Sequence, residues 1–287
     1  MDRTSSPVEN ISDTAHWVAL YRARETERRD AHFHDPYARM LAGERGEEIM
    51  RTMRGGRSNM WAMVVRTCVY DEIILRLIQH NSVDTVLNLA AGLDTRPYRL
   101  QLPATVHWIE VDLPAILTYK EEKLANVQPT CHLERVKLDL AESEARKALF
   151  ARVNAGAKQV LVITEGLMIY LTAEQATSLA TDLHAESHFR YWLSELTSPF
   201  VLQMLQRSWN SQLATGNARV QFAPEDGVKF YERLGWRVAE FRLSMQEAHR
   251  LRREMRYAWL IRFWIRISPP KRREMYGKDG FVLLERE

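Results

Sequence analysis

The chain contains 287 residues, 46% of them hydrophobic, which is enough for one large α/β domain with a substantial core. Its 40 lysines and arginines nearly balance 37 acidic residues, so the net charge of +3 gives no general reason to expect nucleic-acid binding. The two cysteines, Cys68 and Cys131, have neither a C-x-x-C nor a Cys/His spacing, so neither a disulfide framework nor a structural metal site is indicated.

No segment of the sequence predicts a membrane anchor. The N-terminal residues lack the apolar stretch of a secretory signal. The longest apolar run, Val160 to Leu171, is interrupted by Glu165 and is too short to cross a bilayer. Together with the cysteine usage, this pattern predicts a cytoplasmic protein without a bound metal.

The N-terminal part of the chain predicts three helices. The first begins with Asp13 as its N-cap and ends before Phe33, and the second begins at Pro36 and runs through Leu41. Residues 51–59 contain a glycine pair and predict a loop, and the third helix spans Met60 to Gln79.

Arg66 interrupts the apolar face of this third helix. An arginine at such a position is either a surface residue whose aliphatic part packs along the helix, or a residue whose planar guanidinium group binds a carboxylate. The sequence by itself favours the surface interpretation.

The most informative stretch begins with a buried strand, Val83 to Leu89, followed by the small-residue turn Ala90-Ala91-Gly92. The next strand, Val106 to Asp112, has a carboxylate 18 or 20 residues beyond Gly92, at Glu110 or Asp112. In open parallel sheets an acid at this separation binds the ribose hydroxyls of a nucleoside at the strand ends. The stretch therefore predicts a nucleoside cofactor, although a glycine that only makes the turn is a competing interpretation.

The composition of the turn indicates which cofactor it is. A dinucleotide site uses several glycines to hold a pyrophosphate, and this turn has only Gly92. Asp94 follows where a phosphate would be expected, and its charge would repel one. S-adenosylmethionine, which carries a positive sulfonium and no phosphate, is therefore favoured over NAD.

The remaining pattern alternates strands and helices, which predicts right-handed parallel crossovers whose carboxyl ends share one ligand-binding edge. Strands are expected at 133–140, 159–165 and 189–196, with helices at 115–126, 142–153 and 173–186. Two last strands, 236–243 and 280–285, are expected to pair antiparallel at the sheet edge. The predicted organisation is a helical cap at 1–80 and an α/β core at 81–287, with a lid inserted at about 198–227 and a helical segment at about 246–268 within an Arg/Trp-rich stretch at 250–273.

Four runs resemble one known family: N-L-A-A-G-L-D-T-R-P-Y-R-L at 88–100, W-I-E-V-D-L-P at 108–114, V-K-L-D-L at 136–140 and V-I-T-E-G-L-M-I-Y-L at 162–171. They resemble the class I methyltransferases of the leucine carboxyl methyltransferase group, especially its bacterial polyketide O-methyltransferase branch. The resemblance extends from about Asp13 to Arg286. It implies a Rossmann-like, mostly parallel sheet with an antiparallel last strand. Ala90-Ala91 departs from the Gly-Ala that the family often has there.

The resemblance also implies roles for individual residues. Gly92, with Ala91, would let the methionine part of the cofactor pass the turn, and Asp112 would hold the ribose. Asp139 and Leu140 would bind the adenine. Arg66 would bind the cofactor's carboxylate, which reverses the surface interpretation, and Glu165 would face its amino group or sulfonium. The implied cofactor-binding residues are Arg66, Ala91, Gly92, Asp112, Asp139, Leu140 and Glu165.

The catalytic chemistry is less determined by the sequence. Methyl transfer to a carboxylate needs no base, whereas a phenol or alcohol would need one. His184, His188 and Tyr191 are candidates, but none has a spacing that assigns it this role, so no catalytic base is named. Tyr170 and Trp192 are candidate aromatic residues of a substrate wall.

The expected acceptor is a carboxylate or hydroxyl of a small, aromatic or polyketide-like metabolite of secondary metabolism. The C-terminal carboxylate of a protein or peptide is the alternative. A different class of function is a membrane- or RNA-associated protein that binds through the Arg/Trp segment at 256–267. The more ordinary interpretation of this segment is a helix that covers the active-site mouth or forms a homodimer interface.

Overall fold

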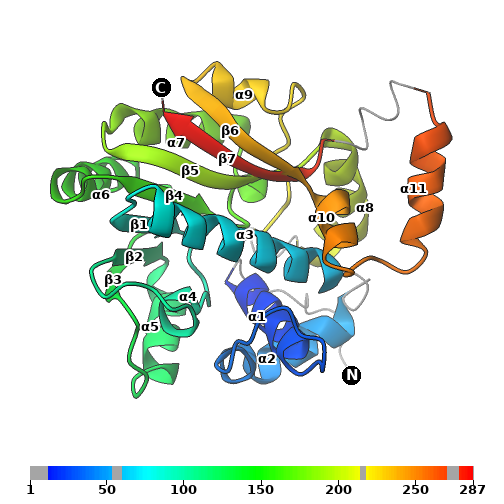
Figure 1. Cartoon of the computed structure of the whole chain (residues 1–287), viewed down its shortest axis with the longest axis horizontal. Helices are drawn as coiled ribbons and strands as arrows, with labels where there is room; N and C mark the ends of the chain where they lie inside the picture. Colours follow the sequence, from blue (N-terminus) through cyan, green and yellow to red (C-terminus); the bar gives the residue numbers. More distant parts are fainter. Residues whose placement is uncertain (1–11, 54–59, 214–217, 270–277, 287) are drawn as a thin grey trace.

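The computed structural model describes residues 12–53, 60–213, 218–269 and 278–286. Part of the predicted loop at 51–59, part of the predicted lid and part of the Arg/Trp-rich stretch lie outside the described residues. Within them, an α/β sandwich is formed around one mixed sheet, as expected (Figure 1).

Three helices precede the sheet: α1 (Asp13–Thr26), α2 (Ala38–Thr52) and α3 (Met60–His80). The predicted end of the second helix at Leu41 is wrong. The chain kinks at Gly43, whose φ of 57° lies in the left-handed region, and then continues as a helix to Thr52.

The sheet contains seven strands in the described part of the chain, in the order β3-β2-β1-β4-β5-β7-β6. They are β1 (Thr85–Leu89), β2 (His107–Asp112), β3 (His132–Lys137), β4 (Val160–Thr164), β5 (Phe189–Leu196), β6 (Trp236–Leu243) and β7 (Gly280–Arg286). The first five strands are parallel, and β7 runs antiparallel between β5 and β6. This confirms the predicted mostly parallel sheet with antiparallel last strands. The third strand ends at Lys137, three residues earlier than predicted.

Helices cover both faces of the sheet. The others in the described residues are α4 (Arg96–Arg99), α5 (Pro114–Lys123), α6 (Ser143–Gly156), the short 3-10 helix η1 (Met168–Tyr170), α7 (Ala173–Ala185), α8 (Pro199–Leu213), α9 (Lys229–Glu232), α10 (Ser244–Arg250) and α11 (Ala258–Ile267). On one face, Ile73 and Leu77 of α3 pack against Val86 and Leu161. On the other face, helices α6, α7 and α9 bury apolar side chains against the same strands.

The helices α1 and α2 pack together below the end of α3 that lies near the strand ends (Figure 1). Trp17, Leu20 and Tyr21 of α1 share a buried cluster with Leu93, in the turn after β1, and with Ile116 of α5. Half-buried apolar side chains of α8 pack against this cluster as well. These elements therefore surround the place where β1 and β2 end.

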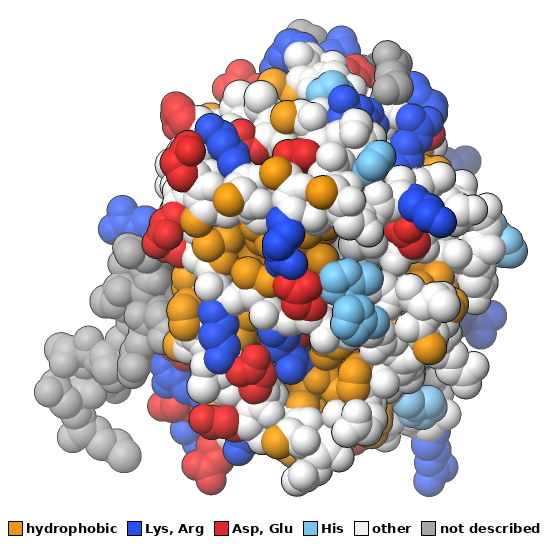
Figure 2. All heavy atoms as spheres, turned by 90° about the vertical axis from the view of Figure 1, so that its left-hand side faces the viewer, with side chains coloured by type: hydrophobic (Ala, Val, Ile, Leu, Met, Phe, Trp, Pro, Cys, Tyr) orange, Lys and Arg blue, Asp and Glu red, His pale blue; other side chains and the backbone are white. Residues whose placement is uncertain are grey.

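Surface charge is mixed on the side of the molecule where α6 and the end of β7 lie (Figure 2). Acidic, basic and hydrophobic side chains are interspersed on this face, in agreement with the small net charge of the sequence. Among the described helices, none is long and apolar enough to cross a membrane.

Candidate active site

The turn after β1 lies directly beside the end of β2. Ala90 and Gly92 both have left-handed backbone, with φ of 54° and 49°. A Cβ atom at Gly92 would come within 3.1 Å of the Ala15 Cβ in α1, so space as well as backbone conformation favours glycine there. Ala90 adopts the strained conformation with a side chain, which costs about 1 kcal/mol or more.

Asp112, the last residue of β2, is bound to this turn through backbone groups. Its Oδ2 accepts a hydrogen bond of 2.6 Å from the Gly92 N–H, and its Oδ1 accepts one of 2.7 Å from the Leu113 N–H. Burial raises the pKa of Asp112 although these two hydrogen bonds favour the ionised form. Each carboxylate oxygen has a second lone pair. The site can therefore accept two further hydrogen bonds from a pair of hydroxyl groups.

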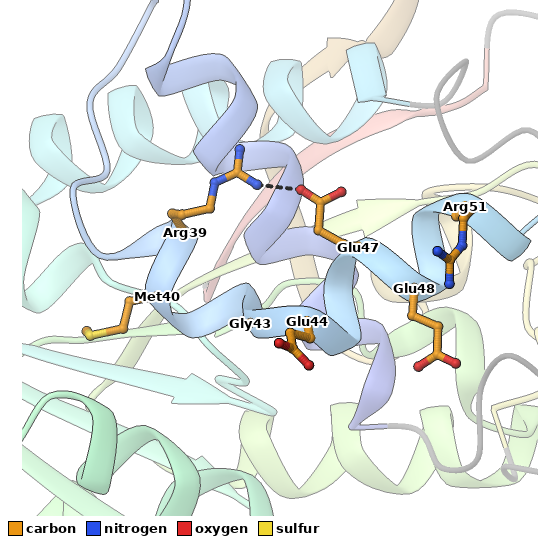
Figure 3. Close-up of a pocket in the computed structure, with 7 residues that line it drawn as sticks. All are labelled: Arg39, Met40, Gly43, Glu44, Glu47, Glu48 and Arg51. Atoms are coloured by element: carbon orange, nitrogen blue, oxygen red, sulfur yellow. Dashed lines mark hydrogen bonds and ion pairs between the residues drawn. The ribbon is translucent and has the colours of Figure 1, made fainter.

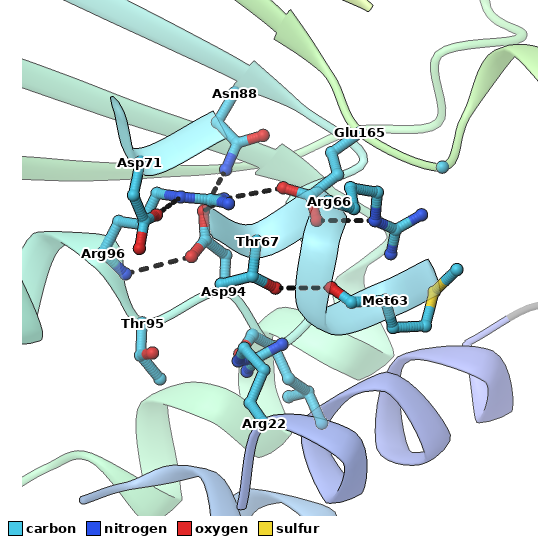
Figure 4. Close-up of polar contacts among 12 residues, drawn as sticks. Arg22, Met63, Arg66, Thr67, Asp71, Asn88, Asp94, Thr95, Arg96 and Glu165 are labelled. Atoms are coloured by element: carbon cyan, nitrogen blue, oxygen red, sulfur yellow. Dashed lines mark hydrogen bonds and ion pairs between the residues drawn. The ribbon is translucent and has the colours of Figure 1, made fainter. Parts of the chain in front are cut away.

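Seven charged side chains form a second feature, which we call the charge cluster. They come from α3, the turn after β1, α4 and the ends of β4 and β5, and they are Arg66, Asp71, Asp94, Arg96, Arg99, Glu165 and Glu195. Figure 4 shows Arg66, Asp71, Asp94, Arg96 and Glu165 of this cluster. The cluster joins α3 to the carboxyl edge of the sheet.

Arg66 and Glu165 lie in direct contact in this cluster. The Arg66 Nε lies 2.9 Å from Glu165 Oε1, and its Nη1 donates to Glu195 Oε1 over 2.9 Å. Arg96 donates to the other Glu165 oxygen over 2.7 Å. Burial opposes the charge on Arg66, but the carboxylates of Glu195 and Glu165 raise its pKa above the ordinary value. No hydrogen bond of Arg66 Nη2 to another described residue is formed.

Asp94 points into the cluster. It is 9% exposed, and its Oδ2 accepts from Asn88 and from Arg96, both over 2.9 Å. Burial raises the pKa of Asp94, but the positive charge of Arg96 outweighs this and holds the pKa well below its usual range. Arg96 offsets part of the charge of Asp94, but the same guanidinium also pairs with Asp71 and Glu165. That Asp94 disfavours a phosphate therefore stays a prediction, beside the argument from the single glycine.

The charges of the cluster do not balance. Three guanidinium groups face four carboxylates, which leaves one uncompensated negative charge when all are ionised. Glu195 reflects this excess, because burial first and then the charge of Glu165 raise its pKa. Its Oε2 also accepts a hydrogen bond of 2.9 Å from the Gly166 N–H. A cation bound beside Glu165 and Glu195 would relieve the repulsion.

The other predicted site residues are distributed differently. Asp139 is exposed after β3, where its side chain accepts from the Ala141 N–H over 2.9 Å, and Leu140 is half-buried. Tyr170 is half-buried at the end of η1, and its carbonyl accepts from Gln221 of the 218–228 segment over 2.8 Å. Burial raises the pKa of Tyr170, which keeps its phenol neutral.

The expectation that Trp192 lines a substrate wall is corrected by its burial. It is fully buried, its Nε1 donates to Thr164 Oγ1 over 2.8 Å, and its ring packs edge-on against Tyr231 and Trp236. Trp192 lies on the face of β5 that is covered by α7 and α9. It is therefore a core residue.

The three candidate bases lie where β5 begins. Tyr191 pairs in register with Glu285 near the end of β7, His188 precedes β5, and His184 lies in the last turn of α7. The opposite end of β5 is the one that carries Glu195. None of the three candidates is therefore near the charge cluster.

A shallow pocket on α2 is lined by Arg39, Met40, Gly43, Glu44, Glu47, Glu48 and Arg51 (Figure 3). It includes no residue of the charge cluster, and Arg39 already forms an ion pair with Glu47. The strand ends, not this pocket, combine the features of a ligand site.

Comparison with known proteins identifies the family. The family model described as leucine carboxyl methyltransferase matches residues 15–184, more than half of the chain. The chain belongs to this family. Its homologues carry the name of a "putative S-adenosyl-L-methionine-dependent methyltransferase". One from Frankia alni is 32% identical over 82% of this chain and 85% of its own length. One from Parafrankia sp. is 36% identical over 60% of this chain and only 58% of its own length.

Solved structures agree on the fold of this family member. A DUF574 family protein from Streptomyces avermitilis has a TM-score of 0.61 at 12% identity and covers 96% of this chain and 97% of its own. A "putative methyltransferase" from Thermobifida fusca has a TM-score of 0.56 at 14% identity. It covers 98% of this chain and 96% of its own. The fold is the class I methyltransferase fold, as expected from the sequence, and the cofactor named for the homologues is the expected one.

The sequence analysis assigned no functional role to three residues of the charge cluster: Asp71, Arg96 and Glu195. Arg96 lies in the T-R-P part of the quoted motif, but no role was assigned to it. Glu195 could have been found from its place at the carboxyl end of β5, next to the end of β4 that Glu165 follows. Asp71 gave no signal, because its pairing with Arg96 and Arg99 joins distant parts of the chain.

Proposed function

We propose that this chain is an S-adenosylmethionine-dependent O-methyltransferase of a small acceptor. The observation that supports the cofactor most directly is the uncompensated negative charge of the charge cluster beside the Gly92 turn. S-adenosylmethionine carries a sulfonium, an ammonium and a carboxylate, so its net charge is positive. Its charge is therefore complementary to that of the cluster.

The residues at the strand ends fit the parts of this cofactor. Arg66 would donate through Nη2 to the methionine carboxylate, and Glu165, together with Glu195, would face the cationic groups. Asp112 would accept from the two ribose hydroxyls through the lone pairs that its backbone contacts leave. Asp139 and Leu140 would face the adenine. Ala91 and Gly92 would let the methionine part pass close to the backbone.

The cofactor, when bound, supplies a methyl group that is activated by the sulfonium. The residues of this chain then have to align the acceptor oxygen and exclude water. Tyr170 would serve the first task, since its neutral phenol can donate a hydrogen bond, and the packing of α1, α2 and α8 around the strand ends would serve the second. Because none of the three candidate bases lies near the cluster, a carboxylate acceptor is chemically the simplest.

We favour an acidic, aromatic metabolite as the acceptor. Tyr170 of η1 and the apolar side chains of α8 next to the strand ends support a planar ligand. A protein or peptide C-terminus is the second candidate, because the name of the family specifies a leucine carboxyl group.

The test is a transfer assay with cofactor that carries an isotope label on its methyl group. Small aromatic acids, phenols and C-terminal peptides are offered separately, with Asp112→Ala as the variant expected to lose activity. Labelling of an aromatic acid supports the proposal. Labelling of peptides alone, lost when the terminal carboxylate is amidated, would support the second candidate. Labelling of nitrogen acceptors alone would refute O-methylation.

A further inference from the structure

Helix α11 presents a continuous apolar face to solvent. Trp259 is 62% exposed, Phe263 56%, Trp264 65% and Ile267 55%, and Leu260 adds a smaller area. At about 100° per residue these five side chains cover an arc of roughly 140° on one side of the helix. Figure 1 shows α11 standing beside the molecule at the end of a connection from α10. Exposed apolar patches of this kind mark interaction surfaces.

The charges around this face have one dominant sign. Between Arg250 and Ile267 the sequence contains six arginines and one acidic residue, Glu254. Arg250 and Arg253 form ion pairs with acidic residues of α1, α3, α10 and the loop after α1, and Arg262 pairs with Glu254.

The three other arginines, Arg252, Arg256 and Arg266, are exposed. On the helix, Arg266 lies at the edge of the apolar arc, next to Trp259. Arg256 precedes α11, where its guanidinium lies 4.9 Å from the centre of the Tyr257 ring. The helix itself contains no acidic residue.

We propose that α11 binds in the plane of an anionic phospholipid bilayer, with Trp259, Phe263 and Trp264 at the boundary of headgroups and acyl chains. Tryptophan favours this boundary, and arginine stems reach from it to lipid phosphates. The helix has 10 residues and is about 15 Å long, so it lies on the membrane and does not cross it. A second copy of the chain is less suitable as the partner, because it would bring arginines against arginines.

The first described strand after α11 is β7, whose first residue, Gly280, pairs with Leu196 at the end of β5. The neighbouring residue Glu195 belongs to the charge cluster. The proposal for α11 does not depend on the proposed acceptor.

Co-sedimentation with vesicles tests the proposal. The wild-type chain is mixed with vesicles of phosphatidylcholine alone or of phosphatidylcholine with phosphatidylglycerol. The double variant Phe263→Ser/Trp264→Ser is compared with Met204→Ser, which changes an exposed apolar residue of α8. We expect binding to the anionic vesicles, a loss of at least about tenfold in the partition coefficient of the double variant, and no change in the control.

A charge variant tests the second half of the argument. Arg266→Gln should lower partition into anionic vesicles about fivefold, as for one cationic side chain near an anionic surface, while Arg51→Gln on α2 should not. Thermal unfolding without lipid verifies that each variant is folded. The proposal is overturned if the wild type does not bind anionic vesicles or if the double variant binds them equally well. It is also overturned if the double variant loses only self-association in light scattering, or only RNA binding in a gel shift.

Discussion

Replacing Glu165 by Gln tests the charge cluster most specifically. Glutamine has the size of glutamate and can still accept a hydrogen bond from Arg96, but it carries no charge. The cluster would then contain three carboxylates for three guanidinium groups, and its excess negative charge would be gone. The variant should therefore bind a cationic ligand less tightly.

The expected size of the effect follows from the contact that is lost. A hydrogen bond between a carboxylate and the cofactor's ammonium contributes about 1.5–3 kcal/mol, which corresponds to an affinity loss of roughly 10- to 150-fold. The ligand-free protein also loses part of two ion pairs, for which we expect about 1–2 kcal/mol, since the side chain of Glu165 is only 15% exposed. The loss of affinity should thus exceed the loss of stability.

Isothermal titration with S-adenosylmethionine and S-adenosylhomocysteine measures the affinity, and thermal unfolding without ligand measures the stability. Glu240→Gln is the matched control, since this residue of β6 forms ion pairs with Arg76 of α3 and with Arg242, and none with the cluster. It should leave both affinities unchanged. A folded Glu165→Gln variant with a lower melting temperature but wild-type affinity would refute the cofactor role and leave Glu165 as a structural residue.

Four further outcomes are expected. Asp112→Ala should weaken S-adenosylhomocysteine binding by about 1–3 kcal/mol in a titration, and unchanged affinity in the folded variant would exclude the ribose role. Ala90→Gly should raise the free energy of unfolding by up to about 1 kcal/mol, because it relieves left-handed strain at a smaller cost in chain entropy; a less stable variant in urea would contradict this. Burial raises the pKa of Cys68 to about 12 and that of Cys131 to about 11, so both thiols should resist a disulfide reagent at neutral pH until the protein is unfolded. The folded-state pKa of Asp94 lies below its ordinary value of 3.8, so its stabilisation is complete above that pH and is lost as the pH falls further; the acid-induced loss of stability below pH 3.8 should be shallower in Asp94→Asn, as followed by urea unfolding.

Much of the fold could be predicted because it depends on local patterns. The buried strands β1 and β4 are rich in Val, Leu and Ile, and their separation by helical stretches indicates parallel crossovers. The end of α2 was misjudged at Leu41, because the helix resumes after the kink at Gly43 and there packs against α1 and α5, which a local pattern does not show. Local patterns also cannot tell which face of β5 a side chain such as Trp192 occupies.

The candidate site was predictable only in part. Gly92 and Asp112 follow from their places after buried strands, because the carboxyl ends of parallel strands meet at one edge. The family resemblance assigned Arg66 and Glu165. The pairing of Arg66 with Glu195 could not be predicted, since the two residues are brought together by α3 and β5 from positions 129 residues apart.

The central claim is that the strand ends hold S-adenosylmethionine and not a dinucleotide. Parallel titrations of the wild-type chain with S-adenosylhomocysteine and with NADH test this directly. We predict saturable binding of S-adenosylhomocysteine, lost or weakened in Asp112→Ala, and no binding of NADH. Binding of NADH without binding of S-adenosylhomocysteine would contradict the account.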